Sequence, residues 1–357
     1  MKENKGITLI ALVITIIVLL IFVGVSINML TGNNGILTQT KLARNATEEA
    51  EKKEKNELLQ IEANFNMNNY EYTDLEGNTA KIPAGFTVSN VKNENLVSKG
   101  LVIIGKNGNE YVWIPCTEDT YKRETLEWEI EDDNGTKAIK DELTLTGIVP
   151  SKEESDNGIT TEILNEIVEQ VKNEIESVKN NGGYYIGRYE VGKENNKAVI
   201  KANQEPNVNI IWSEAYKKAK EIDVGNKAIS YLCSSYAWDT AIEFIQTHSE
   251  AKNYATSRDN FNGNWSDKEI KDKFGNVIKK AGIAAKLNTG LTTSYANIYD
   301  MGGNVGEFTT ELNPNTPETI IIRGGSYFHG KPAGYRWDHV SGNAQDIYGF
   351  RSTLFLI

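Results

Sequence analysis

The stretch "NIYDMGGNVGEF", residues 297–308, decides how the C-terminal part of the chain folds. Two carboxylates, Asp300 and Glu307, lie near its ends, and three glycines lie between them. Glycine adopts positive φ and lets two backbones approach closely, so the run predicts a sharp, tightly packed loop. Such a loop brings two anions close together in a region that is otherwise patterned like β-strands.

The segments around this loop are short and punctuated by glycine. "YYIGRYEVG" (184–192), "IIIRGGSYF" (320–328) and "YGFRSTLFLI" (348–357) each predict a strand. By contrast, residues 161–181 place apolar side chains on one face of a helix, which Thr161 can cap and Gly182 can end. Few helices among many short strands favour an irregular α+β domain over a doubly wound sheet.

Composition excludes several classes of protein. The chain has 357 residues and a net charge of −11, whereas a nucleic-acid binder needs a basic face. Its two cysteines, Cys116 and Cys233, rule out a disulfide-rich scaffold. They allow one disulfide in an extracellular domain or two buried thiols, and we favour the thiols. The three histidines lack the spacing of zinc ligands.

The N-terminus predicts a membrane anchor. Residues 7–29 carry no charge and are long enough to span the hydrocarbon core, so we expect a transmembrane helix over 7–30. Lys2 and Lys5 precede it, and the positive-inside rule then leaves most of the chain outside the cell. A cleaved signal peptide fits less well, because no A-x-A-like site follows. A charged second helix over 36–66 would form a stalk.

The opening "KGITLIALV" (5–13) resembles the start of type IV pilin-like proteins. That resemblance implies a leader over 1–6 and cleavage between Gly6 and Ile7 by a prepilin peptidase. Pilins usually have Glu at the fifth mature position, where this chain has Ala11. A simple anchor and a subunit of a pilus-like assembly therefore both remain open.

Several segments together resemble the formylglycine-generating-enzyme, or sulfatase-modifying-factor, family, which has a C-type-lectin-like fold. The matching pieces, in order, are "VWIPC" (112–116), "YYIGRYEVG", "WSEAYKKA" (212–219), "YAWDTAIEF" (236–244), the 297–308 loop, "RGGSYF" (323–328) and "GFRSTLFL" (349–356). The resemblance covers residues 80–357, with an insertion at about 117–182. It implies the fold more strongly than it implies the activity.

The family's oxidase chemistry is not expected here. Active members hold copper between two cysteines just after "GGSY", and the matching positions are His329 and Gly334. A histidine followed by glycine does not replace two thiolates, because Cu(I) prefers sulfur ligands. We therefore expect no enzyme, although a formylglycine-generating oxidoreductase stays the catalytic alternative.

The resemblance also implies a calcium site in the 297–308 loop. Its ligands would be the Asp300 side chain, the Gly303 and Val305 carbonyls and the Glu307 carboxylate. An oxygen-only set of this kind suits Ca²⁺. A metal-free loop, in which both carboxylates accept backbone N–H bonds, is the alternative. For Arg323 and Arg351 we expect structural roles.

The stretch 327–348 predicts a recognition surface, because large aromatic side chains beside Arg and Asn give contact area at low entropic cost. In related receptor proteins the same region is varied by retroelements, which one sequence cannot test. The alternative is that Tyr335 and Trp337 fill a local core. The predicted ligand contacts are Tyr327, Phe328, His329, Lys331, Tyr335, Arg336, Trp337, Asp338 and His339.

These features together predict a membrane-anchored, receptor- or adhesin-like protein on a bacterial or phage-encoded surface. The sulfatase-modifying-factor scaffold would be non-catalytic and would bind an extracellular protein or glycan. A minor pilin with a structural role is the remaining alternative.

Overall fold

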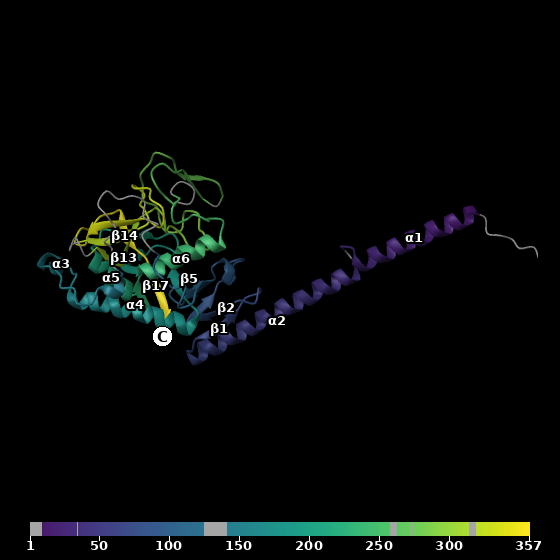
Figure 1. Cartoon of the computed structure of the whole chain (residues 1–357), viewed down its shortest axis with the longest axis horizontal. Helices are drawn as coiled ribbons and strands as arrows, with labels where there is room; N and C mark the ends of the chain where they lie inside the picture. Colours follow the sequence, from purple (N-terminus) through teal and green to yellow (C-terminus); the bar gives the residue numbers. More distant parts are fainter. Residues whose placement is uncertain (1–8, 34, 125–140, 258–262, 273, 314–318) are drawn as a thin grey trace, which may run out of the picture. The chain divides into compact units, whose positions relative to one another are not determined.

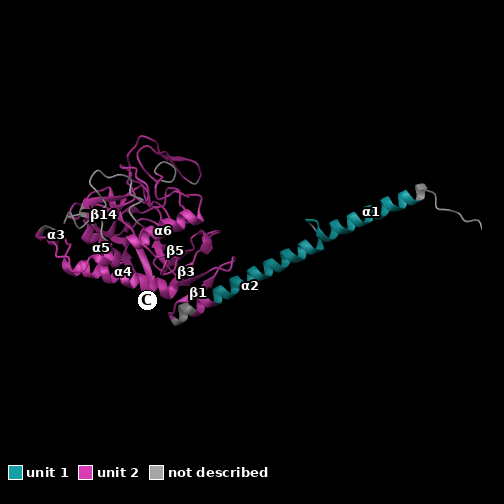
Figure 2. Ribbon diagram, in the orientation of Figure 1, with its two compact units in different colours: residues 1–58 teal, residues 59–357 magenta. Residues whose placement is uncertain are grey.

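The computed structural model describes residues 9–33, 35–124, 141–257, 263–272, 274–313 and 319–357 (Figure 1). The chain divides into two compact units, residues 1–58 and 59–357 (Figure 2). The predicted leader and the Gly6–Ile7 cleavage site lie outside the described residues.

The first unit is helical. Helix α1 (Leu9–Thr31) has no charged residue in its first or last turn, and its apolar side chains are exposed from Leu12 to Leu30. Among the described residues, one helical stretch is long and apolar enough to cross a membrane, and α1 supplies its apolar part. Helix α2 (Ile36–Asn66) covers the range predicted for the stalk and carries exposed pairs such as Arg44–Glu48 at 2.8 Å.

The second unit is mixed α and β, with several small sheets. The largest has six antiparallel strands in the order β10-β17-β6-β5-β4-β3. Their bounds are β3 Phe86–Val88, β4 Val102–Gly105, β5 Glu110–Pro115, β6 Gly183–Gly187, β10 Ala228–Leu232 and β17 Ser352–Leu356. The C-terminal strand β17 thus lies inside the sheet, between β10 and β6.

A four-stranded sheet, in the order β15-β14-β13-β16, follows the glycine-rich loop. Its strands are β13 Gly306–Asn313, β14 Thr319–Arg323, β15 Arg336–Val340 and β16 Tyr348–Phe350, and β13 and β16 run parallel. Smaller sheets comprise β1 Tyr70–Thr73 with β2 Thr79–Ile82, β7 Gly192–Glu194 with β8 Lys197–Val199 and β9 Glu205–Pro206, and β11 Ile270–Lys271 with β12 Val277–Lys279. The described residues confirm the α+β class, whereas the C-type-lectin-like fold stays a prediction.

Strand alternation builds a core on each face of the six-stranded sheet. On one face Ile103, Trp113 and Tyr185 join the first core, together with Trp212 of α5 (Trp212–Lys220). On the other face Val112 and Tyr184 join the second core, together with α6 (Ser235–His248).

Helix α4 (Thr161–Asn181) confirms the predicted amphipathic helix and contributes to both cores. Its cap is Thr160 rather than the predicted Thr161, because the Thr160 side chain accepts the Ile163 N–H. Gly182 ends the helix in the left-handed conformation, as predicted, with φ of 75°. The short helix α3 covers Lys152–Asp156, and two 3₁₀ turns cover Val97–Lys99 and Glu142–Thr144.

The segment predicted as an insertion, 117–182, is tied into the core where the structure describes it. The Glu174 carboxylate accepts hydrogen bonds from Tyr121 at 2.8 Å and from Ser234, the N-cap of α6, at 2.6 Å. Glu142 accepts the Ser235 N–H at 2.8 Å in the first turn of the same helix. Both carboxylates therefore satisfy donors at a buried helix N-terminus. Residues 125–140 lie outside the described residues.

Glu174 makes the stability of the protein depend on pH. Burial raises its pKa to about 7, from 4.5. Since the folded pKa is the higher one, the stabilisation is fully present below pH 4.5 and is lost as the pH rises through 7. We expect it to amount to about 3 kcal/mol. Comparing Glu174→Gln with wild type by denaturant unfolding at pH 5 and pH 8 should show a flatter decline in the variant. The matched control, Glu169→Gln on the exposed side of α4, should keep the wild-type slope; an equal slope in both variants would contradict the assignment.

Candidate functional site

The glycine-rich loop is as sharp as the sequence predicts. Asp300, Gly303 and Asn304 all have positive φ, of 54°, 102° and 56°. Asp300 and Asn304 tolerate this conformation better than most residues, because their short polar side chains bond locally. Asp300 is 3% exposed and Glu307 is 1% exposed, so the loop carries both carboxylates into the interior.

A third carboxylate, Glu190, joins these two and was not predicted. It follows strand β6 and is 1% exposed. Its oxygens accept hydrogen bonds from Asn304 Nδ2 at 2.7 Å and from the Val305 N–H at 3.0 Å. Glu190 thus holds the glycine-rich loop through one side-chain donor and one backbone N–H. The detectable signal in the sequence was a carboxylate, two residues after Arg188, in a stretch that is otherwise aromatic and apolar. A buried acid needs hydrogen-bonding partners.

Arg351 supplies the positive charge of this acidic cluster, which we define as Glu190, Asp300 and Glu307. Its guanidinium bonds both oxygens of Glu307, at 2.9 and 2.5 Å, and donates to the carbonyls of Gly187 and Tyr299. Asp300 accepts a hydrogen bond from Thr292 Oγ1 at 2.6 Å. The structural role predicted for Arg351 is confirmed.

The acidic cluster places three carboxyl groups around the Arg351 guanidinium. Burial raises the pKa of Asp300 to about 6 and that of Glu307 to about 7. Burial, together with the charges of Asp300 and Glu307, raises the pKa of Glu190 well above its ordinary value. Burial and mutual repulsion thus favour the protonated carboxyl groups, and a bound cation would favour the carboxylate forms again.

The calcium prediction is compatible with this chemistry but stays a prediction. Asp300 and Glu307 offer the carboxyl oxygens that Ca²⁺ favours, although Arg351 already bonds both oxygens of Glu307. Across the described ranges, however, no group of three or more His, Cys, Asp or Glu side chains could hold a metal ion. A site would therefore depend on these two carboxylates and the carbonyls of Gly303 and Val305.

The predicted recognition stretch divides into a buried part and an exposed part. Tyr327, Tyr335 and Arg336 are only 9%, 7% and 1% exposed. This burial leaves little side-chain surface for a ligand, and the prediction that these three contact one stays a prediction. The Tyr327 hydroxyl donates to Asp346 at 2.9 Å, and the Lys331 ammonium lies 4.3 Å from the centre of the Tyr335 ring. For Tyr335, the alternative of a local core holds.

Arg336 belongs to a buried ion network beneath the four-stranded sheet. Arg336 and Arg323 each bond both Asp239, of helix α6, and Glu311, of β13, at 2.5–3.1 Å. Arg123 adds a third guanidinium, 2.9 Å from Glu311. Burial alone would raise the pKa of Glu311, but these guanidiniums hold that pKa well below its ordinary value. The predicted structural role of Arg323 is confirmed.

The remaining predicted contacts are at least partly exposed and surround the edge strand β15. Phe328 is 58% exposed, and Lys331 and Asp338 are partly exposed. We call the four rings Phe328, His329, Trp337 and His339 the aromatic patch. The His329 ring meets Phe328 at 4.8 Å and Trp337 at 5.2 Å between ring centres, and His339 meets the buried Tyr348 at 4.5 Å. The patch is thus a connected layer of rings.

The two histidines of the patch favour the neutral form. Burial lowers the pKa of His329, and the nearby Lys331 lowers it further. Burial also lowers the pKa of His339, against the opposing charge of Asp338. At neutral pH the two imidazole rings of the patch are therefore uncharged.

The two cysteines are buried free thiols, the alternative favoured from sequence. Both belong to the second core. Burial raises the pKa of Cys116 to about 12 and that of Cys233 well above its ordinary value. Thiols in this state are poor nucleophiles and poor metal ligands, because both roles require the thiolate.

No family model matches the chain, and no curated protein matches it. Among solved structures, the chain is similar to PvdO from Pseudomonas aeruginosa, at 16% identity over 49% of this chain and 82% of that one, with a TM-score of 0.29. CarF matches at 14% identity over 49% and 87%, with a TM-score of 0.30. Treponema denticola variable protein 1 matches at 16% identity over 80% and 98%, with a TM-score of 0.21. Likenesses this distant carry no argument about fold or function.

Proposed function

We propose that this is a membrane-anchored, surface-displayed binding protein whose aromatic patch contacts an extracellular protein or glycan. The observation that carries the proposal is the connected set of rings that runs from Phe328 through His329 to Trp337 on β15, with Phe328 exposed. Large rings that remain partly accessible are typical of recognition surfaces. Trp337 also packs against the first core, so the patch rests on a rigid base.

The anchor in this proposal is helix α1, with α2 as the stalk. The apolar side chains of α1 are exposed from Leu12 to Leu30, which is costly in water and favourable in lipid. The proposed placement of residues 59–357 outside the cell follows from the lysines before α1. Incorporation into a pilus-like filament remains the alternative use of the same helix.

We propose a non-catalytic scaffold, possessing a calcium ion as its only cofactor. The high pKa values of both thiols and their burial support the absence of copper-dependent cysteine oxidation. The two buried carboxyl groups of Asp300 and Glu307, whose raised pKa values a bound cation would lower again, support the calcium ion. Turnover of a cysteine-containing peptide with added copper would contradict the first part.

The binding proposal predicts that substitutions in the patch abolish recognition. The full chain in lipid nanodiscs would be tested on a panel of glycans and extracellular proteins. The double variant Phe328→Ala, Trp337→Ala should bind at least tenfold more weakly than wild type, as expected for central aromatic contacts. Phe274→Ala is the matched control, since Phe274 is 78% exposed elsewhere in the same unit. A double variant that binds like wild type would overturn the proposal. The proposal would also be overturned if the wild-type protein bound none of the glycans and proteins in the panel.

A further inference from the structure

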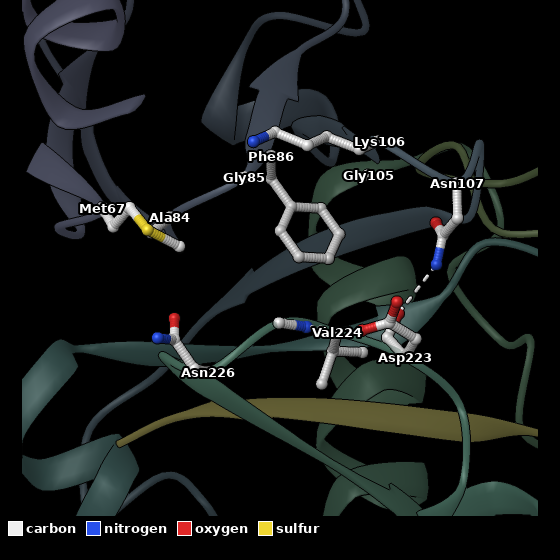
Figure 3. Close-up of a pocket in the computed structure, with 11 residues that line it drawn as sticks. Met67, Ala84, Gly85, Phe86, Gly105, Lys106, Asn107, Asp223, Val224 and Asn226 are labelled. Carbon is white, nitrogen blue, oxygen red and sulfur yellow. Dashed lines mark hydrogen bonds between the residues drawn. The ribbon is translucent and has the colours of Figure 1, made fainter. Parts of the chain in front are cut away.

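A cavity of about 460 Å³ lies away from the aromatic patch, at the first residue of edge strand β3. Its walls are Met67, just after α2, and three turns: the one before β3, the one between β4 and β5, and the loop before β10 (Figure 3). Asn107 Nδ2 donates to the Asp223 carbonyl at 2.8 Å, and the Asp223 side chain accepts the Gly225 N–H at 3.1 Å. Two of the three turns are therefore tied to each other, so the cavity is largely preformed.

The cavity is kept open by glycine. Three of its eleven lining residues are glycines, Gly85, Gly105 and Gly225. A Cβ at position 105 would lie only 3.1 Å from Cε1 of Phe86 and 2.9 Å from Oδ1 of Asn107. Gly85 and Gly225 have φ of +88° and +78°, which other residues rarely adopt. The backbone thus excludes the side chains that would otherwise fill this space.

The floor is apolar and the rim is polar. Phe86, Val224 and Ala84 are buried and form apolar parts of the wall. Figure 3 shows the Lys106 side chain along one side, with Asp223, Val224 and Asn226 along the other. Apolar walls with a few polar groups at the rim are typical of small-molecule sites, and the volume lies within their usual range.

The two rim charges are not equivalent. The Asp223 carboxylate already accepts an N–H bond, from Gly225. No hydrogen bond or ion pair joins the exposed Lys106 ammonium to any other described residue. The Lys106 ammonium is therefore a rim group that is available to an anionic ligand.

We propose that this cavity binds a small organic carboxylate with a flat apolar body. The body lies against Phe86, Val224 and Ala84, and the carboxylate accepts hydrogen bonds from the Lys106 ammonium. This site is independent of the aromatic patch, since the two share no residue.

The test uses 2-naphthoate as the probe and 2-naphthylmethylamine as its cationic counterpart. Both are titrated into the full chain in zwitterionic nanodiscs by saturation-transfer NMR, with empty nanodiscs to subtract partitioning into lipid. We expect saturable binding of the carboxylate and at least tenfold weaker binding of the amine. Equal or tighter binding of the amine, or a lack of saturable binding of the carboxylate, would overturn the proposal.

Two variants locate the probe. Lys106→Glu should weaken naphthoate binding about tenfold or more, because a charge-assisted hydrogen bond is lost. Asn226→Phe, which adds bulk at the exposed rim, should also weaken it. Lys217→Glu is the control, since it makes the same charge change at a 77%-exposed side chain on α5. If Lys106→Glu binds like wild type, or if Lys217→Glu weakens binding as much, the carboxylate site is refuted; thermal unfolding of each variant confirms that it is folded.

Discussion

Replacing Arg351 by methionine should lower the free energy of unfolding by about 3–5 kcal/mol, the usual cost of removing one partner from a buried ion pair. Arg351 is completely buried and is bonded to both oxygens of Glu307. Without it, Glu190, Asp300 and Glu307 would share a buried space, and Lys268, whose charge acts on Asp300, would be the remaining cation near them. The measurement is denaturant unfolding at pH 7.5, with a chelator present so that adventitious metal ions do not replace the guanidinium.

The same substitution should cost less at low pH. The pKa values of Asp300 and Glu307 are already raised to about 6 and about 7 with Arg351 present. Near pH 5 these groups would be largely protonated, and less uncompensated charge would remain. The control is Lys172→Met, which removes an exposed pair with Glu169 and should change stability by less than about 1 kcal/mol. Equal effects of the two variants, or an Arg351→Met effect that grows as pH falls, would contradict this account of the cluster.

Replacing Arg336 by methionine should be comparably destabilising, at about 3–5 kcal/mol. Arg336 lies between Asp239 and Glu311, both fully buried, at 2.5–3.2 Å. Its loss would leave two carboxylates with Arg323 and the partly accessible Arg123. The measurement is again denaturant unfolding, because the residue acts on the fold rather than on a ligand.

A neighbour on the same strand provides the contrast. Asp338 is partly exposed, and Asp338→Asn should change the free energy of unfolding by less than about 1 kcal/mol. If Arg336→Met left stability unchanged yet abolished ligand binding, Arg336 would be a surface contact after all. The original sequence prediction would then be right for this residue.

Local sequence signals predicted the glycine-rich loop but not all of its partners. Three glycines between Asp300 and Glu307 were enough to predict a sharp turn, and the positive φ values of Asp300 and Asn304 agree. Glu190 was missed because it lies more than 100 residues earlier, on a segment whose pattern predicts only a strand. Contacts that a distant segment completes leave little trace in local periodicity.

The recognition stretch, residues 327–348, is a second case in which the local pattern does not reveal the contacts. Period-two alternation separates Arg336 from Trp337, but it cannot say which face of β15 is buried. The acids that receive Arg336, Asp239 and Glu311, come from a helix and from another strand. Composition alone therefore grouped a core arginine with surface rings.

The segment 117–182 was predicted as an insertion relative to the resembling family, and that stays a prediction. Its acidic composition gave no sign that Glu142 and Glu174 would be completely buried. They are tolerated inside because they accept bonds from the first turn of α6 and from neighbouring hydroxyl groups. Only the amphipathic helix within this segment had a periodic signal strong enough to predict its packing.

A ligand that contacts the aromatic patch should shield its rings from solvent. The most direct measurement is hydroxyl-radical footprinting of the full chain in nanodiscs, free and then saturated with whichever panel glycan or protein binds it. We predict that bound ligand slows oxidation of Phe328, His329 and Trp337 at least severalfold while Phe274 keeps its rate. Unchanged oxidation of the three patch residues, with protection appearing elsewhere on the unit, would contradict the proposed contact.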